Sequence, residues 1–309
     1  MTSHVDIVIV NWNSKDQLQT CVKSLIQSAG PEIGSIIIVD NGSTDGSDVG
    51  VDDIPGVKVH RAGENLGFGA ACNIGAKLGD SEFILLLNPD AFVYEDTIQK
   101  SLSYMTAEEN SGVGVCGVQL KDEQGHISKS CTRLPTVGGL IAHALGLDRL
   151  YPKAGHFMSE WDHQDTRSVD HVIGAFYLIR RSLFETLGGF DHRFFVYLED
   201  LDLSNRVKCA GWDIKYLADV HAFHKGGGTS DQVKALRLFY SLRSRIIYSF
   251  KHFGAVGATS VLLATMLVEP LSRIIVSIAR GSLPSLKETV RAYGYLWSWL
   301  PRWIFNSSK

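Results

Sequence analysis

Apolar runs that end in asparagine or aspartate constrain the fold of this chain more than any other feature. The runs cover residues 5–10, 35–39 and 82–87, with a weaker run at residues 57–61. Continuous Val, Ile and Leu are typical of strands that are buried on both faces. Helical spacing of apolar residues lies between the runs, over residues 18–26 and 73–78. The alternation predicts an α/β fold whose mostly parallel central sheet is covered by helices on both faces.

Amides and carboxylates gather where three of these runs end. They are Asn11, Asn13, Asp40, Asn41, Asn88 and Asp90. The ligand site of a parallel sheet lies beyond the carboxyl ends of its strands. Buried strands have no structural need for such polar ends, so the repetition predicts a ligand site at this edge of the sheet.

Charge is divided unevenly along the chain. Residues 231–309 carry 11 lysines and arginines against 3 acidic residues, a net charge of +8, and residues 1–230 carry a net charge of −11. We therefore expect a catalytic domain at residues 1–230 and a basic, apolar helical segment at residues 231–309, with different partners. The acidic body argues against a nucleic-acid-binding protein, whose main domain is usually basic.

The remaining sequence adds weaker signals. Residues 113–118 and 171–179 are strand candidates, and the polar, glycine-rich stretch 120–168 is expected to form loops over an open site. The five cysteines include no CxxC pair, which is typical of a reducing cytosol and predicts neither a disulfide framework nor a zinc site. Polar residues from Asp6 onward predict that no signal peptide begins the chain.

Two strand ends carry motifs that suit a nucleotide and a metal ion. In residues 40–45 (DNGSTD), Asp40 could accept the imide N–H of a pyrimidine base, or the segment could be a turn that caps the next helix. In residues 88–91 (NPDA), Asp90 could hold a divalent cation against a diphosphate, or the segment could be a plain turn. The motifs alone leave both alternatives open.

Two later segments suit proton transfer and metal binding. Residues 197–203 (YLEDLDL) place Glu199, Asp200 and Asp202 beside apolar side chains, which raises a pKa as a general base requires. The same acids could instead complement a helix dipole. In residues 221–230 (HAFHKGGGTS), glycines let the backbone approach a phosphate. His224 could join a carboxylate on a cation, or it could be structural.

Common nucleotide-binding loops are missing from the sequence. Residues 67–69 (GFG) precede a predicted helix, but Cys72 stands where a dinucleotide loop has its third glycine, and no strand directly precedes the segment. These departures argue against a nicotinamide cofactor. The sequence also contains no GxxxxGK motif, which excludes a P-loop nucleotidase.

Taken in order, the motifs resemble those of the family 2 glycosyltransferases of GT-A fold, and within them the bacterial rhamnosyltransferase-like group. The likeness covers about residues 5–250. The matching segments are residues 8–14 (VIVNWNS), 40–47 (DNGSTDGS), 65–73 (NLGFGAACN), 86–91 (LLNPDA), 174–181 (GAFYLIRR), 188–206 (GGFDHRFFVYLEDLDLSNR), 224–230 (HKGGGTS) and 240–245 (YSLRSR).

The resemblance implies an inverting transferase that moves a sugar to a glycan or lipid-linked glycan in bacterial cell-surface polysaccharide synthesis. The favoured donor is dTDP-L-rhamnose. Asp200 would be the catalytic base, with Glu199 and Asp191 positioning the acceptor. Asp90 would hold Mg²⁺ or Mn²⁺ with the help of His224. The donor would be bound by Asn11, Asn13, Asp40, Asn73, Asn88, Arg243 and Arg245.

Two positions depart from the pattern of the group. Asn88 replaces the first acid of the usual acid-x-acid metal motif, which would weaken metal binding. Ser244 stands where the group commonly has Asn, which leaves the roles of Arg243 and Arg245 open.

The last part of the chain has its own pattern. Residues 253–268 form an uncharged run of 16 residues, which Glu269 and Pro270 interrupt. A spanning helix needs about 20 residues. The basic segment with Trp297, Trp299 and Trp303 suits an interfacial anchor on the cytoplasmic face of a bacterial inner membrane. A helical cap on the catalytic domain and a spanning hairpin over residues 253–279 are the alternatives.

Other functions share parts of this pattern. A UDP-sugar is the alternative to the rhamnose donor. A nucleotidyltransferase also uses strand-end acids, metal and nucleotide, but it needs an early basic phosphate loop, and residues 10–16 offer only Lys15. A catalytically silent sugar-nucleotide sensor or membrane scaffold would lack a base, whereas Glu199 and Asp200 are present.

Overall fold

Two compact units make up the chain in the computed structural model, which describes residues 4–28, 30–226 and 234–306. The sheet unit consists of Met1–Leu134, Trp161–Phe195 and Glu199–Thr229. The helical unit consists of Pro135–Glu160, Val196–Leu198 and Ser230–Lys309. The predicted boundary at residue 230 lies outside the described residues and stays a prediction. The same holds for the glycines at 227 and 228 and for Thr229 and Ser230 of the predicted phosphate loop.

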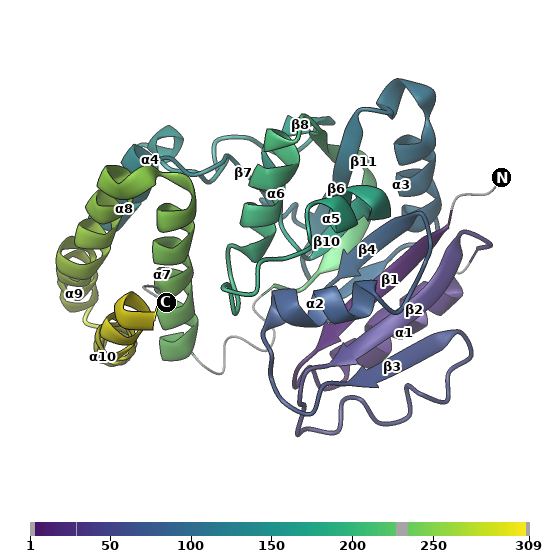
Figure 1. Ribbon diagram of the computed structural model, residues 1–309, viewed down its shortest axis with the longest axis horizontal. Helices are drawn as coiled ribbons and strands as arrows, with labels where there is room; N and C mark the ends of the chain where they lie inside the picture. Colours follow the sequence, from purple (N-terminus) through teal and green to yellow (C-terminus); the bar gives the residue numbers. More distant parts are fainter. Residues whose placement is uncertain (1–3, 29, 227–233, 307–309) are drawn as a thin grey trace. The chain divides into compact units, whose positions relative to one another are not determined.

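A mixed sheet forms the centre of the sheet unit (Figure 1). Within the described residues it has nine strands, in the order β3-β2-β1-β4-β10-β6-β11-β5, with β8 beside β11. These strands are β1 (Val5–Asn11), β2 (Ile33–Asp40), β3 (Val57–Arg61), β4 (Phe83–Leu87), β5 (Ala91–Val93), β6 (Val113–Lys121), β8 (Arg167–Val169), β10 (Phe176–Arg180) and β11 (Asp213–His224). Strands β1 to β4 pair in parallel, as do β6 and β11. The predicted α/β class with a mostly parallel central sheet is confirmed.

Helices cover both faces of the parallel half. The helices of the sheet unit are α1 (Gln17–Gln27), α2 (Phe68–Ala76), α3 (Thr97–Thr106), α5 (Arg181–Thr186) and α6 (Glu199–Cys209). Side chains alternate along a strand, and Val5, Ile7 and Ile9 of β1 belong to the core cluster that includes residues of α1 and α3. On the other face, a Cβ added at Gly75 of α2 would lie 2.3 Å from Val8 Cγ1. Close packing of α2 on β1 therefore requires glycine there.

Three elements differ from the prediction. The stretch expected to form loops contains α4 (Val137–Leu145), whose hydroxyl cap is Thr136 Oγ1, accepting from Gly139 N. The predicted strand 171–179 is divided into β9 (His171–Val172) and β10, because the backbone N–H of Gly174 is bonded to a side chain of α6. Strand β9 pairs with β7 (Cys131–Thr132) in a separate two-stranded sheet. The 12-residue strand β11 was not predicted, because polar residues interrupt its apolar pattern.

The helical unit contains α4 and the C-terminal helices. These are α7 (Lys234–His252), α8 (Gly254–Leu263), the π-helix Ala264–Val268, α9 (Glu269–Ala279) and α10 (Leu283–Asn306). Leu242 and Ile246 of α7 pack with Tyr293 and Leu296 of α10, and Trp299 and Trp303 pack against this cluster. These two indoles therefore contribute to the core of the unit, whereas Trp297 is 56% exposed.

An apolar helix, Gly254–Ala279, runs through α8, the π-helix and α9. Within the described residues it is the one helix long and apolar enough to cross a membrane, with a mean hydropathy of 1.8 over its best window. Glu269 and Pro270 interrupt the uncharged run, as the sequence shows, but they do not interrupt the helix. Pro270 lies in the first turn of α9 directly after the π-helix, whose wider turn is a common way for a helix to accommodate an interruption.

Candidate active site

Asn11 and Asp40 lie side by side at the carboxyl ends of β1 and β2, where they are register partners. Asn11 is fully buried, and its Nδ2 donates to Asp40 Oδ1 (2.8 Å) and to Ser47 Oγ (2.9 Å). Asp40 Oδ2 accepts the backbone N–H of Ser43 (3.1 Å). The DNGSTD segment therefore forms a turn closed by the Asp40 side chain, but the next element is β3 and not a helix. The expectation that this turn caps a helix is wrong, and the nucleotide role of Asp40 stays a prediction.

Asn13 fixes the same loop from the other side. Its φ of 50° is left-handed, a conformation that asparagine tolerates better than most residues. Its Oδ1 accepts the backbone N–H of Thr44 (2.8 Å), and its own N–H donates to Ser43 Oγ (3.0 Å). Hydrogen bonds of Asn13 with Ser43 and Thr44 thus hold the loops after β1 and β2 together.

Asn73 connects two distant parts of the sheet unit. Its Nδ2 donates to the carbonyl of Phe190 (2.9 Å), and its Oδ1 accepts the N–H of the same residue (2.8 Å). A Cβ at Gly189 would lie 2.4 Å from Asn73 Oδ1, so glycine is required beside this contact. The amide therefore holds the segment before the acidic cluster against α2, and its predicted contact with the donor remains untested.

Asp90 and His224 meet at the edge where β5 pairs with β11. His224 is the register partner of Ala91, and its Nε2 lies 3.3 Å from Asp90 Oδ1. Asn88 Nδ2 lies 3.5 Å from the same ring nitrogen. Both partners of the Asp90–His224 pair are mostly buried, at 11% and 13% exposure. The structure brings together the three residues that the sequence assigned to the metal and diphosphate.

A carboxylate, an imidazole and an amide form a donor set that suits a hard or borderline divalent cation. Among the described residues, no group of three or more His, Cys, Asp and Glu is arranged to hold a metal. A cation at Asp90 and His224 would therefore need oxygens from a ligand to complete its coordination, as Mg²⁺ sites on substrate phosphates do.

Glu199 and Asp200 begin α6 and differ in their surroundings. Glu199 is 5% exposed, and its Oε2 has no hydrogen-bond partner among the described residues. Burial raises the pKa of Glu199 well above its ordinary value, and the charge of Asp200 raises it further. Glu199 is thus held toward its neutral form.

Asp200 has the opposite tendency. Burial acts to raise its pKa, but the charge of His171, 3.4 Å away, and two backbone N–H groups outweigh burial. Gly174 N donates to Oδ2 (2.9 Å) and Leu201 N to Oδ1 (2.8 Å). The pKa of Asp200 therefore lies below its ordinary value, and its carboxylate is ionised at neutral pH.

The segment before β10 connects the metal pair with this carboxylate. Gly174 donates to Asp200, and the next residue, Ala175, accepts the backbone N–H of Asn88 (3.1 Å). One short stretch therefore contacts the end of β4 on one side and the start of α6 on the other. Asn88, whose side chain lies beside His224, and Asp200 are therefore bonded to neighbouring residues of the sheet unit, and their membership of one active site stays a prediction.

Backbone strain precedes α6. Tyr197 and Leu198 have φ values of 69° and 63°, which cost free energy for side chains of this size. Just upstream, Phe195 accepts the backbone N–H of Phe68 (2.8 Å), and a Cβ at Gly67 would lie 2.3 Å from that carbonyl oxygen. Such strain persists only where surrounding contacts determine the conformation, and it is frequent at functional sites.

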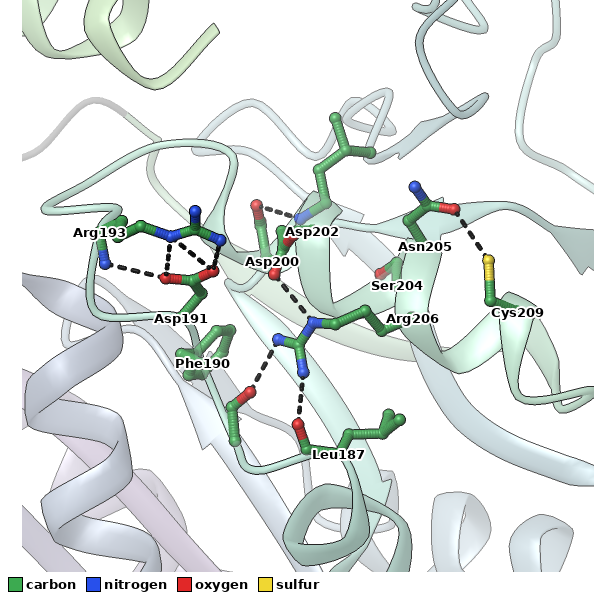
Figure 2. A network of polar contacts seen from close by, with 12 residues as sticks. Leu187, Phe190, Asp191, Arg193, Asp200, Asp202, Ser204, Asn205, Arg206 and Cys209 are labelled. Carbon is green, nitrogen blue, oxygen red and sulfur yellow. Dashed lines mark hydrogen bonds and ion pairs between the residues drawn. The ribbon is translucent and has the colours of Figure 1, made fainter. Parts of the chain in front are cut away.

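The other acids near α6 are engaged by arginines (Figure 2). Both oxygens of Asp191 accept from Arg193, with Nη2 at 2.7 Å. Asp202 is fully buried and pairs with Arg206 (2.9 Å). Arg206 also donates to the carbonyls of Leu187 and Gly189. Through Arg206, Asp202 thus holds the turn at Leu187 and Gly189 against α6. The predicted acceptor contact of Asp191 stays untested.

Arg243 and Arg245 belong to the helical unit, on α7. Arg245 is buried and paired with Glu269, whose other oxygen accepts from Arg273 at 2.7 Å. The Arg243 guanidinium lies 5.6 Å from the ring centre of Trp299. Arg245 is therefore neutralised by a residue of its own unit. The predicted diphosphate contacts of both arginines remain predictions.

His171 and Thr132 are the site residues that the sequence did not single out. They are register partners in the small sheet, and Thr132 Oγ1 lies 2.9 Å from His171 Nδ1. A lone histidine inside a strand candidate gives no signal of Thr132, 39 positions before it, or of Asp200, 29 positions after it.

Known proteins are similar to this chain in sequence and in fold. A family model described as Glycosyl transferase family 2 matches residues 6–188. Over 272 residues the chain is 29% identical to the N-acetylglucosaminyl-diphospho-decaprenol L-rhamnosyltransferase of Mycobacterium tuberculosis, covering 82% of this chain and 87% of that protein. Over 173 residues it is 30% identical to Rhamnosyltransferase WbbL of Escherichia coli, covering 53% of this chain and 62% of that protein.

A solved structure gives the corresponding result for the fold. Mannosyltransferase PcManGT from Pyrobaculum calidifontis, in complex with GDP-Man and Mn²⁺, superposes with a TM-score of 0.56 at 17% identity. The match covers 92% of this chain and 78% of that chain. This likeness confirms the predicted fold class.

Proposed function

This chain belongs to glycosyl transferase family 2, and from that premise we propose that it transfers L-rhamnose from dTDP-L-rhamnose, with inversion, to a lipid-linked glycan. The reaction would serve bacterial cell-surface polysaccharide synthesis. Two relatives named as rhamnosyltransferases support the sugar, and the first, named for a decaprenol-linked sugar, supports the acceptor.

The observation that carries the proposal is the arrangement around Gly174 and Ala175. Ala175 accepts from Asn88, which lies beside His224 of the Asp90–His224 pair, and Gly174 donates to the ionised Asp200 at the start of α6. Inverting transfer requires a counter-charge for the leaving diphosphate and a base near the acceptor hydroxyl. In this proposal the Asp90–His224 pair would hold the cation that supplies the counter-charge, and Asp200 would supply the base.

On the donor side, Asn11, Asn13 and Asp40 would bind the nucleoside at the ends of β1 and β2. Asp90 and His224, with Asn88 beside them, would hold Mg²⁺ or Mn²⁺. When bound, the cation would neutralise negative charge on the diphosphate. The Mn²⁺ of the Pyrobaculum calidifontis mannosyltransferase structure supports a divalent cation here, without distinguishing the two metals.

On the acceptor side, Asp200 would take the proton of the attacking hydroxyl. The hydroxyl oxygen forms a bond to the anomeric carbon as the bond from that carbon to the diphosphate oxygen breaks, and the proton moves to the carboxylate. Glu199, held toward its neutral form, can donate a hydrogen bond to the acceptor. Asp191 would contact the acceptor from the loop before α6, and Arg243 or Arg245 would balance diphosphate charge.

The helical unit would place the site at the cytoplasmic face of the inner membrane as a peripheral anchor. Its support is a net positive charge together with an exposed apolar face on the helix Gly254–Ala279. A lipid-linked acceptor is embedded in the same surface.

A panel of nucleotide sugars tests the donor. A ligand at 100 times its dissociation constant stabilises a fold by about 2.7 kcal/mol, so dTDP-L-rhamnose should raise the melting temperature and be hydrolysed slowly to dTDP. UDP-glucose, UDP-N-acetylglucosamine and GDP-mannose are the controls. A clear shift with a UDP-sugar and none with dTDP-L-rhamnose would overturn the donor and favour the alternative UDP-sugar transferase.

A further inference from the structure

His171 lies between a hydroxyl and the carboxylate assigned as the base. Its Nδ1 is 2.9 Å from Thr132 Oγ1, and its Nε2 is 3.4 Å from Asp200 Oδ2. His171 is 4% exposed, and its Nε2 makes no hydrogen bond to any described residue. The carboxylate of Asp200 is therefore the group that this nitrogen faces.

The two ring nitrogens of a histidine are coupled, because the partner of one decides where the proton of the other lies. If the Thr132 hydroxyl donates to Nδ1, the ring proton lies on Nε2 and points toward Asp200. A protonated ring also carries a proton on Nε2. In both states the carboxylate faces an N–H group, which favours its ionised form.

We propose that His171 is a positioning residue that fixes Asp200 Oδ2, and that Thr132 sets the orientation of the His171 ring. This inference rests on the proposed role of Asp200 as the base. Oδ2 is occupied by Gly174 N and faces His171, whereas Oδ1 accepts from Leu201 N. The contacts leave Oδ1 as the oxygen that receives the acceptor proton.

Other titratable and charged groups surround the carboxylate. Glu199 and Cys72 are buried next to it, and Asp200 acts to raise the pKa of both, after burial as the larger cause. Burial raises the pKa of Tyr177 of β10, and the charge of Asp200 acts in the same direction. The Tyr177 hydroxyl contacts Ser204 Oγ. Asp202 and Arg206 of α6 form an ion pair, and Asp191 and Arg193 of the preceding loop form another. His171 is thus the cationic or proton-donating side chain placed to offset these acidic neighbours.

A pH profile of slow dTDP-L-rhamnose hydrolysis, with water as acceptor, tests this role. In His171→Leu the pKa of Asp200 should rise, so the acidic limb should move to higher pH by about 1 unit or more. His171→Gln keeps a neutral donor and should shift it less. Thr132→Val should shift the limb in the same direction, and Thr132→Ser should restore the wild-type profile.

A merely structural histidine predicts a different result. The rate would then fall by one factor at all pH values, or stay unchanged, with the acidic limb in place in both His171→Leu and Thr132→Val. Either outcome overturns the inference. Activity retained by Asp200→Asn would instead overturn the base assignment itself.

A second measurement does not depend on turnover. Nitrogen-15 NMR of histidine-labelled protein, with the His171 signals identified by their loss in His171→Gln, reports which ring nitrogen carries the proton. We expect a protonated Nε2 at neutral pH in the wild type and in Thr132→Ser. A ring protonated on Nδ1 alone would place a lone pair against Asp200 and would overturn the inference.

Discussion

Asp90 and His224 contact each other at 3.3 Å on neighbouring strands, so their separate contributions can be measured. Asp90→Ala removes the hard oxygen ligand and should abolish the metal-stimulated part of dTDP affinity, because the carboxylate is the negatively charged member of the set. His224→Ala should have a smaller effect. Calorimetry with Mg²⁺ or Mn²⁺ and with EDTA measures the dTDP affinity of both variants.

The control is Asp96→Ala, which removes an exposed acid that pairs with Lys100. Equal affinities of the wild type in metal and in EDTA would contradict the metal assignment.

The three acids of α6 should respond differently to amide substitution. Asp200→Asn keeps the shape and removes the basicity, so turnover should fall by about 10²–10⁴-fold with donor affinity nearly unchanged. Glu199→Gln resembles the neutral form that its raised pKa favours, and should act mainly on acceptor binding. Asp202→Asn weakens the pair with Arg206, and should lower stability more than turnover.

Single-turnover rates, nucleotide affinities and melting temperatures of these three variants separate the roles. Substantial activity in Asp200→Asn together with its loss in Glu199→Gln or Asp202→Asn would mean that the base is a different carboxylate.

The contrast between Asp90 and His171 explains which site residues a sequence can predict. Asp90 follows an apolar strand directly, and parallel strands bring such ends to one edge. His171, Asn73 and Arg245 act through contacts with residues 29, 117 and 24 positions away. No local pattern encodes these pairings, since they depend on how distant elements pack.

Helix α2 shows how one glycine fixes the distance between two elements. In Gly75→Ala the new Cβ would lie 2.3 Å from Val8 Cγ1 and 3.2 Å from Val39 Cγ2. Overpacking of a core typically costs about 1–3 kcal/mol, which exceeds the gain of about 1 kcal/mol from better helix propensity. We therefore expect a lower free energy of unfolding, measured by denaturant titration.

The matched control is Gly294→Ala in α10, where an added Cβ meets nothing within 4 Å. This variant should be more stable than the wild type by about 0.5–1 kcal/mol, because only propensity changes. Stabilisation by both substitutions would contradict the proposed close packing of α2 on the sheet.

Glu269, at the start of α9, is buried and forms ion pairs with Arg245 and Arg273. Burial acts to raise its pKa, but Arg245 and Arg273 outweigh burial and hold the pKa below its ordinary value. Glu269→Gln leaves a buried arginine poorly compensated, so we expect a loss of about 3–5 kcal/mol of unfolding free energy. Because the folded pKa is lowered, the contribution is present above the ordinary pKa of glutamate and is lost as pH falls through the folded value.

Denaturant titrations at pH 7 and at pH values below 4 measure this effect. The stability difference between wild type and Glu269→Gln should shrink as pH falls. Glu288→Gln on α10 is the control, with an expected change within about 0.5 kcal/mol. A difference between wild type and Glu269→Gln that does not depend on pH would contradict the ion-pair explanation.

Elements differed in how well their sequence predicted them. Strands β1, β2 and β4 each contain a run of at least four apolar residues, and runs of this length bounded by polar turn residues indicate buried strands. Strand β11 contains Asp213, Lys215 and Asp219, which hide its strand pattern in the sequence, although half of its residues are buried in the sheet. Helix α4 was missed because Gly138 and Gly139 resemble loop residues, and it is the packing within the helical unit that makes the segment helical.

At the scale of the whole chain, charge and apolar exposure coincide in one unit. The helical unit carries 13 lysines and arginines against 5 acidic residues, a net charge of +8. On the helix Gly254–Ala279, large apolar side chains between 51% and 83% exposed recur at helical spacing, namely Val256, Leu263, Leu267, Leu271, Ile275 and Ile278. A solvated helix normally has polar residues on its outer face, so this face suits the boundary of a lipid bilayer.

The basic residues of the same unit define the lipid that it should prefer. Arg280, Lys287, Arg291 and Arg302 are exposed, and each basic residue near an anionic surface contributes about 1 kcal/mol of attraction. We expect the full-length protein to cosediment with phosphatidylglycerol-containing vesicles at low salt, and less with pure phosphatidylcholine.

The combined variant Arg280→Gln, Lys287→Gln and Arg291→Gln should lose the preference for anionic lipid. Leu267→Glu with Ile275→Glu should weaken binding to both kinds of vesicle, because it places charge on the apolar face. Val49→Glu, on an exposed valine of the sheet unit, is the matched control and should bind as the wild type does. If the wild type fails to cosediment with anionic vesicles at low salt, the helical unit has a structural role and the acceptor must reach the site from solution.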